Sequence, residues 1–230
     1  MCGGAGEVGE GIVRQLLAEG NQVLVQSRTE AKLTELTLRL GAPAEMKTIV
    51  GDVSSEAAAS ALRSAIVDGG FELDAVVASI GSWWSGPALI DLDVKTYLRV
   101  MDDRITVHFI VAKTFLPLLT DRQGSSYVFI HGASGFFPIA NSGPVSIAGA
   151  AQVMLKDVFA KELESKAVRI NLLSMMGAIA TRSHPTADPE SLTADDVGQY
   201  VAYLVSDRSS ERGETIKYSH RRQLHDLNSS

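Results

Sequence analysis

The sequence predicts an α/β fold in which a parallel sheet is covered by helices on both faces. Short apolar runs, typical of buried strands, alternate with longer segments of helical spacing along the whole chain. A glycine-rich turn also opens directly into a helix near the amino end. Right-handed crossovers between parallel strands then give a doubly wound arrangement in three layers. The 230 residues show no internal repeat and no linker, so we expect a single domain over residues 1–230.

Each element of this fold is predicted from its own pattern. Buried strands are expected at the short apolar runs, which are residues 23–26, 47–50, 74–79, 127–130, 168–173 and 215–218. Helices are expected where apolar side chains recur every three or four residues, at 12–18, 29–40, 55–67, 94–119, 145–163 and 195–204. The second of these helices is predicted to end at Gly41, a typical helix terminator.

The amino end departs from the expected pattern. In a doubly wound fold a strand precedes the glycine-rich turn, yet only Met1 and Cys2 precede Gly3. Loss of a central strand would leave the hydrogen-bonding edges of its neighbours unpaired. We therefore expect the first strand to be truncated, or to be missing upstream of Gly3.

Composition excludes several classes of function. The net charge is −6 and no basic block occurs, so nucleic acid is not expected as a partner. Cys2 is the single cysteine, which leaves no disulfide framework or zinc-ligand cluster and fits a reducing cytoplasm. No apolar run is long enough to span a bilayer, and no signal peptide is visible. We expect a cytoplasmic protein without a metal site or a membrane partner.

The glycine-rich turn is the first candidate binding site. Gly3, Gly6 and Gly9 allow a tight turn, and the backbone amides of the turn, including those of Glu7 and Val8, can approach a pyrophosphate at the start of the helix. A carboxylate at position 7 would oppose phosphate binding unless it points away. The spacing predicts a site for a nicotinamide dinucleotide.

The ends of the next two predicted strands supply candidates for the adenosine end of that dinucleotide. Ser27 and Arg28 stand where an acidic residue would accept the ribose hydroxyls of NAD, and a guanidinium can instead hold a 2′-phosphate. The cofactor favoured is therefore NADP(H). Asp52 and Val53 follow the second of these strands, at the same edge of the predicted sheet. The alternatives are that Arg28 is a solvated residue at a helix start and that Asp52 is an ordinary turn residue.

Over nearly its whole length the chain resembles the short-chain dehydrogenase/reductases. The resemblance rests on the TGxxGxxG-like spacing from Cys2 to Gly9, the VRIN strand at 168–171 and the helix at 150–163, which is similar to the family's KAA…AxEL run. It implies a Rossmann fold and an NADP(H)-dependent oxidoreductase by descent. Asp52 and Val53 resemble the family's Asp-Val pair, which implies contacts beside the adenine. Ser79 and Gly81 fall in the place of the family's Asn-Asn-Ala-Gly segment beside the cofactor, where only the glycine is retained.

The same resemblance implies that the usual catalytic residues are absent. The positions of the family's tyrosine and lysine fall on Val145 and Gly149, its serine on Gly132 and its helix asparagine on Arg104. Valine cannot transfer a proton, and glycine offers no charge. We therefore assign no catalytic residue.

Other residues could have taken over the chemistry. His131 and Ser134 flank the vacated serine position, and Arg104 and His108 lie one helical turn apart. Together with Trp83, near the expected nicotinamide, they could form a new proton-transfer or anion site. The alternative is that His131 is a hydrogen-bonded core histidine and that Arg104 pairs with Asp102 or Asp103 nearby in sequence.

Three hypotheses about function follow. The first is a non-catalytic NADP(H)-binding protein that acts as a sensor or as the structural partner of a catalytic paralogue. The second is an active NADPH-dependent oxidoreductase with relocated residues His131 and Arg104, and the third is a scaffold that no longer binds cofactor.

The resemblance also implies a homodimer or homotetramer, packed through the helices at 94–119 and 145–163. The small residues of the second helix would permit close approach, namely Ala148, Gly149, Ala150 and Ala151.

Overall fold

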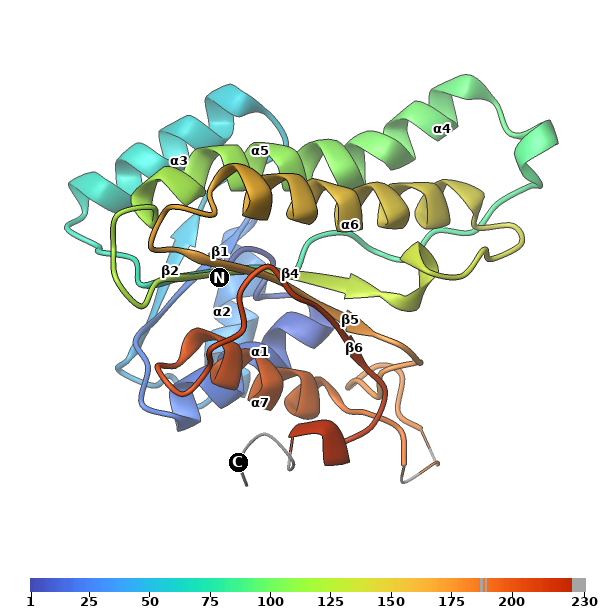
Figure 1. The fold of residues 1–230 in the computed structure, drawn as a ribbon. Helices are drawn as coiled ribbons and strands as arrows, with labels where there is room; N and C mark the ends of the chain where they lie inside the picture. Colours follow the sequence, from blue (N-terminus) through green and yellow to red (C-terminus); the bar gives the residue numbers. More distant parts are fainter. Residues whose placement is uncertain (187, 189, 225–230) are drawn as a thin grey trace.

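A computed structural model describes residues 1–186, 188 and 190–224 and contains the predicted parallel sheet between two layers of helices (Figure 1). The strands lie in the order β2, β1, β3, β4, β5, β6, with the amino-terminal residues between β1 and β3. The strands are β1 (Val23–Ser27), β2 (Met46–Val50), β3 (Ala75–Ala78), β4 (Ser126–Gly132), β5 (Arg169–Met175) and β6 (Thr215–Tyr218). The strand pairs β1–β2, β3–β4, β4–β5 and β5–β6 are all parallel, in agreement with the doubly wound prediction.

Met1 and Cys2 join the two halves of the sheet. Cys2 forms parallel bridges to Gln26 of β1 and to Ala78 of β3. The Met1 carbonyl accepts from the Gln26 amide at 3.0 Å, and the Cys2 carbonyl accepts from the Ser79 amide at 3.0 Å. These two residues therefore occupy the place of the strand that the sequence predicts to be truncated.

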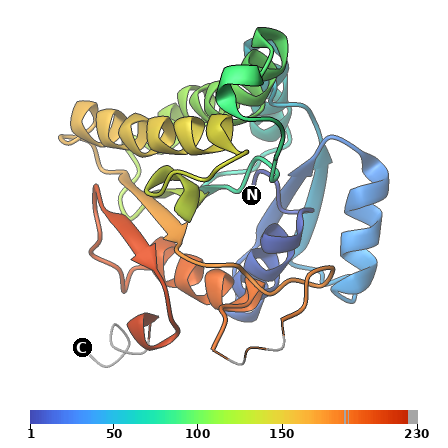
Figure 2. The same cartoon turned by 90° about the vertical axis from the view of Figure 1, so that its right-hand side faces the viewer.

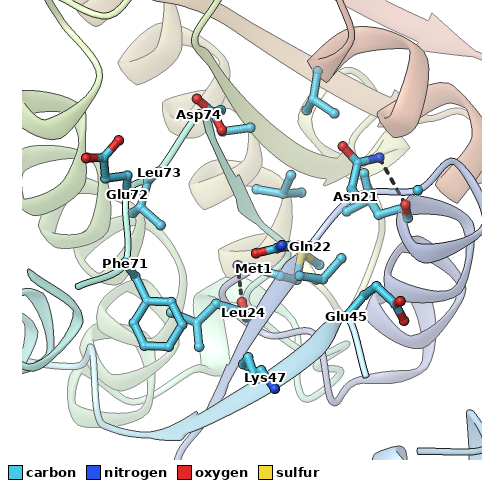
Figure 3. A pocket seen from close by; sticks show the side chains of 16 residues that line it. Met1, Asn21, Gln22, Leu24, Glu45, Lys47, Phe71, Glu72, Leu73 and Asp74 are labelled. Carbon is cyan, nitrogen blue, oxygen red and sulfur yellow. Dashed lines mark hydrogen bonds between the residues drawn. The ribbon is translucent and has the colours of Figure 1, made fainter. Parts of the chain in front are cut away.

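A cavity of about 400 Å³ lies between β1 and β3 on the amino side of these two residues (Figure 3). Met1, Leu24 and Phe71 are among the residues that line it, and the Met1 ammonium group donates to the Leu24 carbonyl at 2.8 Å. Burial lowers the pKa of this ammonium group. The cavity lies at the amino ends of the strands, whereas ligands of open α/β sheets bind at the carboxyl ends.

The helices form two layers (Figures 1 and 2). Those of one layer are α1 (Glu7–Ala18), α2 (Glu30–Arg39) and α7 (Ala194–Val205). Those of the other layer are α3 (Glu56–Asp68), α4 (Val94–Met101), α5 (Val107–Phe115) and α6 (Gly143–Glu162). Alternate residues of β4 serve the two cores, because Val128 and Ile130 pack with α1 and α7 while Tyr127 and Phe129 pack with α3 and α5.

Most predicted boundaries agree with the structure to within a few residues, and two differ for physical reasons. Helix α1 begins at Glu7 rather than at residue 12. It includes Gly9 and Gly11, which are poor helix formers but are needed there for close packing: a Cβ on Gly11 would lie 2.3 Å from the Ala194 carbonyl oxygen of α7.

The predicted helix at 94–119 is the second difference. It is divided into α4, a π-helical turn η2 (Asp102–Thr106), α5 and a final 3-10 turn η3 (Leu116–Leu118). A π turn widens the helix locally and changes the direction of the side chains around it. Apolar periodicity does not reveal such a turn, since it keeps the segment helical. Arg104 lies at its centre.

Candidate cofactor and substrate cleft

The main cavity at the carboxyl ends of the strands has a volume of about 840 Å³. It extends from the glycine turn at 6–9, past Ser79 and Gly81, to Val145 and Gly149 of α6. Its position agrees with the general rule that ligands of doubly wound folds bind beyond the carboxyl ends of the strands. Its volume is in the range of cofactor and ligand sites.

The glycine turn has the geometry that a pyrophosphate requires. Gly3 has a φ of +76°, and a Cβ there would lie 2.0 Å from the Ser79 carbonyl oxygen. A Cβ on Gly9 would lie 2.4 Å from the Gly3 carbonyl oxygen. Gly6 is the N-cap of α1 and supplies no side-chain hydrogen bond to the helix. The first amides of α1 have no intrahelical acceptor and lie at the positive end of the helix dipole, so the turn fits an anionic group.

Glu7 turns its carboxylate away from the turn and toward the segment 181–184. The carboxylate accepts a short hydrogen bond from the Thr181 hydroxyl and lies 3.5 Å from Nδ1 of His184 and 3.8 Å from the Arg182 guanidinium. Hydrogen bonds from Ser183 and Thr181 lower the pKa of Glu7 to about 2. The conflict between this carboxylate and a bound phosphate, expected from the sequence, is therefore reduced by local pairing.

The candidates for the adenosine end do not line the main cavity. Ser27, Arg28, Asp52 and Val53 are absent from its described wall, as is Gly3 of the glycine turn, whereas Gly6 to Gly9, Ser79 and Gly81 are present.

The strand-end candidates nevertheless lie together, since the Gly51 amide donates to the Ser27 carbonyl at 3.0 Å. Arg28 is exposed at this edge. Asp52 accepts from the amides of Val53 at 2.8 Å and Ser54 at 3.1 Å, the geometry of a turn residue. Hydrogen bonds from Ser54 above all, with a smaller effect of Arg28, hold the pKa of Asp52 below its usual value.

The structure brings to one cavity the four positions on which the resemblance places the family's catalytic residues. Arg104, Gly132, Val145 and Gly149 all line it, and no tyrosine or lysine is found among the described residues of its wall. The wall therefore lacks the phenol and ammonium groups that the resemblance associates with catalysis.

His131 occupies space that two glycines leave open. A Cβ on Gly149 would lie 2.6 Å from Cε1 of His131, and one on Gly135 would lie 2.3 Å from its Nε2. Gln152 of α6, which the sequence analysis missed, is also buried in this wall and donates to the Ile130 carbonyl at 3.3 Å. Its spacing of three residues from Gly149 on a helix could have indicated that the two share a face.

Two buried histidines lie next to Arg104. Burial lowers the pKa of His108 and of His131 to about 4 in each case, and the positive charge of Arg104 contributes in the same direction. Nε2 of His108 lies 3.1 Å from the Ile80 carbonyl oxygen. Nε2 of His131 is buried without a hydrogen-bond partner in the described structure, so the expected hydrogen-bonded core histidine is only partly correct. Both rings are uncharged at neutral pH.

The sequence-based alternative for Arg104, an ion pair with an adjacent aspartate, is wrong. Asp102 accepts instead from the Thr106 hydroxyl at 3.0 Å, and Asp103 pairs with Arg99 at 3.8 Å. The π turn directs Arg104 to the cavity, where a Cβ on Gly81 would lie 3.2 Å from its Nη1. Trp83 also lines the cavity and is 63% exposed rather than buried as core.

Within the described part of the chain, no group of three or more His, Cys, Asp or Glu residues is placed to hold a metal ion. No helix among the described residues is both long enough and apolar enough to cross a membrane.

The fold and the cleft define a doubly wound α/β protein, and comparison with known proteins identifies its family. The sequence profile described as short chain dehydrogenase matches residues 1–190, so the chain belongs to the short-chain dehydrogenase family. An oxidoreductase of Staphylococcus epidermidis, described as uncharacterized, is 24% identical over 211 residues, covering 91% of this chain and 90% of that protein. A rhamnolipid-biosynthesis 3-oxoacyl-[acyl-carrier-protein] reductase of Pseudomonas aeruginosa is 29% identical, covering 85% of this chain and 78% of that protein.

Solved structures agree with this fold. A short-chain type dehydrogenase/reductase from Mycobacterium ulcerans has a TM-score of 0.86 at 22% identity, covering 97% of this chain and 88% of that one. A structure described as ElxO with NADP bound has a TM-score of 0.82 at 19% identity, covering 95% of both chains. At these identities the similarity establishes the Rossmann-like fold alone.

Proposed function

We propose that this short-chain dehydrogenase family member binds NADP(H) and lacks the family's usual tyrosine–lysine chemistry. The observation that carries the proposal is the single cleft with uncapped helix amides at one end and no tyrosine or lysine among its described wall residues at the other. The protein then acts as a sensor of the cofactor or as the structural partner of a catalytic paralogue.

The proposed contacts divide along the cofactor. The backbone of Gly3, Gly6, Glu7, Val8 and Gly9 holds the pyrophosphate, with the Glu7 carboxylate turned aside. The other contacts are those of Ser27 and Arg28 with the 2′-phosphate, of Asp52 and Val53 with the adenine side, and of Ser79 and Gly81 with the part that enters the cavity. The exposed guanidinium of Arg28 beside the turn of Asp52 favours NADP(H) over NAD(H).

The decisive experiment is titration of the purified protein with NADPH and NADH by calorimetry. We expect NADPH to bind at least about tenfold more tightly, because a guanidinium makes charge-assisted hydrogen bonds to the 2′-phosphate. In Arg28→Gln this preference should be lost while NADH binding is unchanged. Absence of binding by either cofactor would refute the proposal and favour the third hypothesis, a scaffold without a cofactor.

One observation favours a second candidate, an active NADPH-dependent oxidoreductase with relocated residues. His131 and Arg104 line the same cavity, and Arg104 influences the pKa of His131. A pKa of about 4 makes His131 a poor proton donor at neutral pH, however, which is why this candidate ranks second. Turnover of a carbonyl compound, lost in His131→Ala or Arg104→Ala, would reverse the ranking.

Assembly and location belong to the proposal as well. We expect a homodimer or homotetramer formed through α4, α5 and α6, with a catalytic paralogue as a further possible subunit. A cytoplasmic location remains a prediction based on the single cysteine.

A further inference from the structure

Arg104 differs from the other partly buried arginines in having no partner. Arg14, Arg122 and Arg169 each donate to a carboxylate or carbonyl oxygen. Arg104 is partly buried too, yet it makes no hydrogen bond or ion pair with any residue that the structure describes. A guanidinium removed from water without a compensating partner lowers stability, and a ligand that pairs with it would offset this cost.

The carboxylates that could serve Arg104 are engaged elsewhere. Asp102 and Asp103 are held by Thr106 and Arg99. Glu7, the one acidic residue in the described wall of the cavity, is held by the segment 181–184. Burial lowers the pKa of Arg104, and the charge of Asp103 opposes this shift without forming an ion pair. The cavity therefore contains a positive charge that no described carboxylate contacts. This charge favours a negatively charged ligand.

The rest of the cavity indicates the body of that ligand. The described wall of the cavity is largely apolar, with Trp83, Ile139, Val145 and Met175 among its residues. The buried Ser134 and His131 are among the polar residues of the same wall, and Nε2 of His131 has no hydrogen-bond partner among the described residues. A planar guanidinium matches the two oxygens of a carboxylate, and the apolar wall matches a hydrocarbon chain or ring.

We propose that Arg104 is the anchor of a binding site for carboxylic acids with an apolar body, in the cavity wall that the usual catalytic residues have vacated. The inference rests on the proposed function, in which the cofactor occupies the other end of the same cleft. It names the chemical class of the second ligand, as substrate or effector. The cofactor's own phosphates are the alternative occupant, which the experiment distinguishes.

The test uses octanoate, with octanamide and octanol as uncharged probes of the same length. Binding to the full chain is followed by calorimetry and by tryptophan fluorescence, since Trp83 lines the cavity and Trp83 and Trp84 are the two tryptophans. We expect octanoate to bind at least about tenfold more tightly than octanamide, because only the carboxylate forms charge-assisted hydrogen bonds with the guanidinium. Equal affinity of the two probes would overturn the proposal.

Variants assign the effect to the guanidinium. Arg104→Gln should lose about tenfold or more in octanoate affinity and leave octanol binding unchanged, and Arg104→Lys should retain part of the preference. Arg63→Gln, which changes an exposed arginine outside the cavity, is the matched control. The melting temperature of Arg104→Gln should not fall, because the substitution removes an unpaired charge. A clear fall, together with equal loss of octanoate binding in Arg104→Lys, would indicate that Arg104 has a structural role. That outcome would overturn the proposal.

NADPH titration of the same variants separates this inference from the proposed function. If Arg104→Gln abolishes NADPH binding, Arg104 holds the cofactor and the inference is overturned. If the unmodified protein binds neither NADPH nor NADH but still prefers octanoate over octanamide through Arg104, the proposed function fails and the carboxylate site stands.

Discussion

Because Gly9 has no side chain, the start of α1 can lie in close contact with the backbone of Gly3 and Gly4. The Cβ of any other residue would lie 2.4 Å from the Gly3 carbonyl oxygen and 2.8 Å from Cα of Gly4, both of them backbone atoms that cannot rotate away. The sequence already indicated this turn, because glycines at this spacing directly before a helix are what a tight, closely packed turn requires.

We predict that Gly9→Ala destabilises the protein by about 1–3 kcal/mol, the range of overpacking in a tight core, and abolishes NADPH binding. Urea unfolding and calorimetric titration measure the two effects. Gly132→Ala is the matched control, because a Cβ there meets no atom within 4 Å and the φ of −114° suits any residue. If both variants bound NADPH as the unmodified protein does, the proposed contact at the glycine turn would be wrong.

The individual contacts of the cleft were less predictable than the turn. Glu7 could be identified as a carboxylate near the expected phosphates, but its pairing with Thr181 joins residues 174 positions apart. Asp102 and Asp103 were expected to pair with Arg104 because they are adjacent in sequence, and they pair elsewhere because helical geometry favours partners three or four residues away. Neither long-range pairing nor a π turn changes the spacing of apolar residues, so the sequence pattern does not predict them.

At the scale of elements, the start of α1 is tied to the segment that follows β5. Glu7 connects the two through its contacts with Thr181, Arg182 and His184. The buried carboxylate of Glu10 forms ion pairs with Arg14 at 2.9 Å and Arg39 at 3.0 Å. The same segment lines one side of the main cavity. Part of the cavity wall is therefore held in place by side-chain contacts with Glu7 at the start of α1.

We predict that Glu7→Gln loosens residues 181–184 without affecting the sheet. Loss of the carboxylate weakens hydrogen bonds that contribute about 1 kcal/mol in total, so backbone amides of this segment should exchange with deuterium several-fold faster. Glu19→Gln is the control, because Glu19 ends the same helix and pairs with Arg208 at 3.5 Å on an exposed surface. Unchanged exchange in Glu7→Gln would contradict the assigned contact.

At the scale of the whole molecule, the alternation of patterns predicted the architecture well, because each buried strand and helix is specified by its own apolar residues. The interrupted long helix and the early start of α1 were not predicted, since packing against Ala194 and the π turn at Arg104 are tertiary effects. In the same way, Ala148 and Gly149 were expected at a subunit interface but are buried within the chain, where Gly149 accommodates His131.

The two buried histidines give the whole molecule a defined dependence on pH. In the folded state the pKa values of His108 and His131 lie near 4, below the ordinary value of 6.5, so the unfolded chain binds more protons between these two values. The free energy of unfolding should therefore fall as pH is lowered from about 6.5 to about 4, by on the order of 3 kcal/mol for each histidine.

Urea unfolding at a series of pH values measures this dependence. His131→Gln should remove about half of it, and His220→Gln, which changes an exposed histidine, should leave it unchanged. A pH dependence that His131→Gln does not alter would show that this ring is not the buried neutral group assigned to it.

The outer face of the α4–α6 layer carries the last prediction. Ile147, Met154 and Val158 form an exposed stripe on α6, with exposed fractions of 40%, 61% and 44%, and Phe109 of α5 adds 44%. The spacing of residues 147, 154 and 158 places them on one face of α6, and the Phe109 ring stacks on Phe159 of the same helix. Exposed apolar side chains of this kind are what subunit contacts cover. We expect a dimer or tetramer by light scattering after gel filtration, and a monomer for Met154→Glu at unchanged helix content. Leu38→Glu makes the same change at a residue that is 72% exposed on α2, in the opposite layer, and should leave the assembly intact. A monomeric unmodified protein would contradict this prediction and leave the stripe without its proposed role.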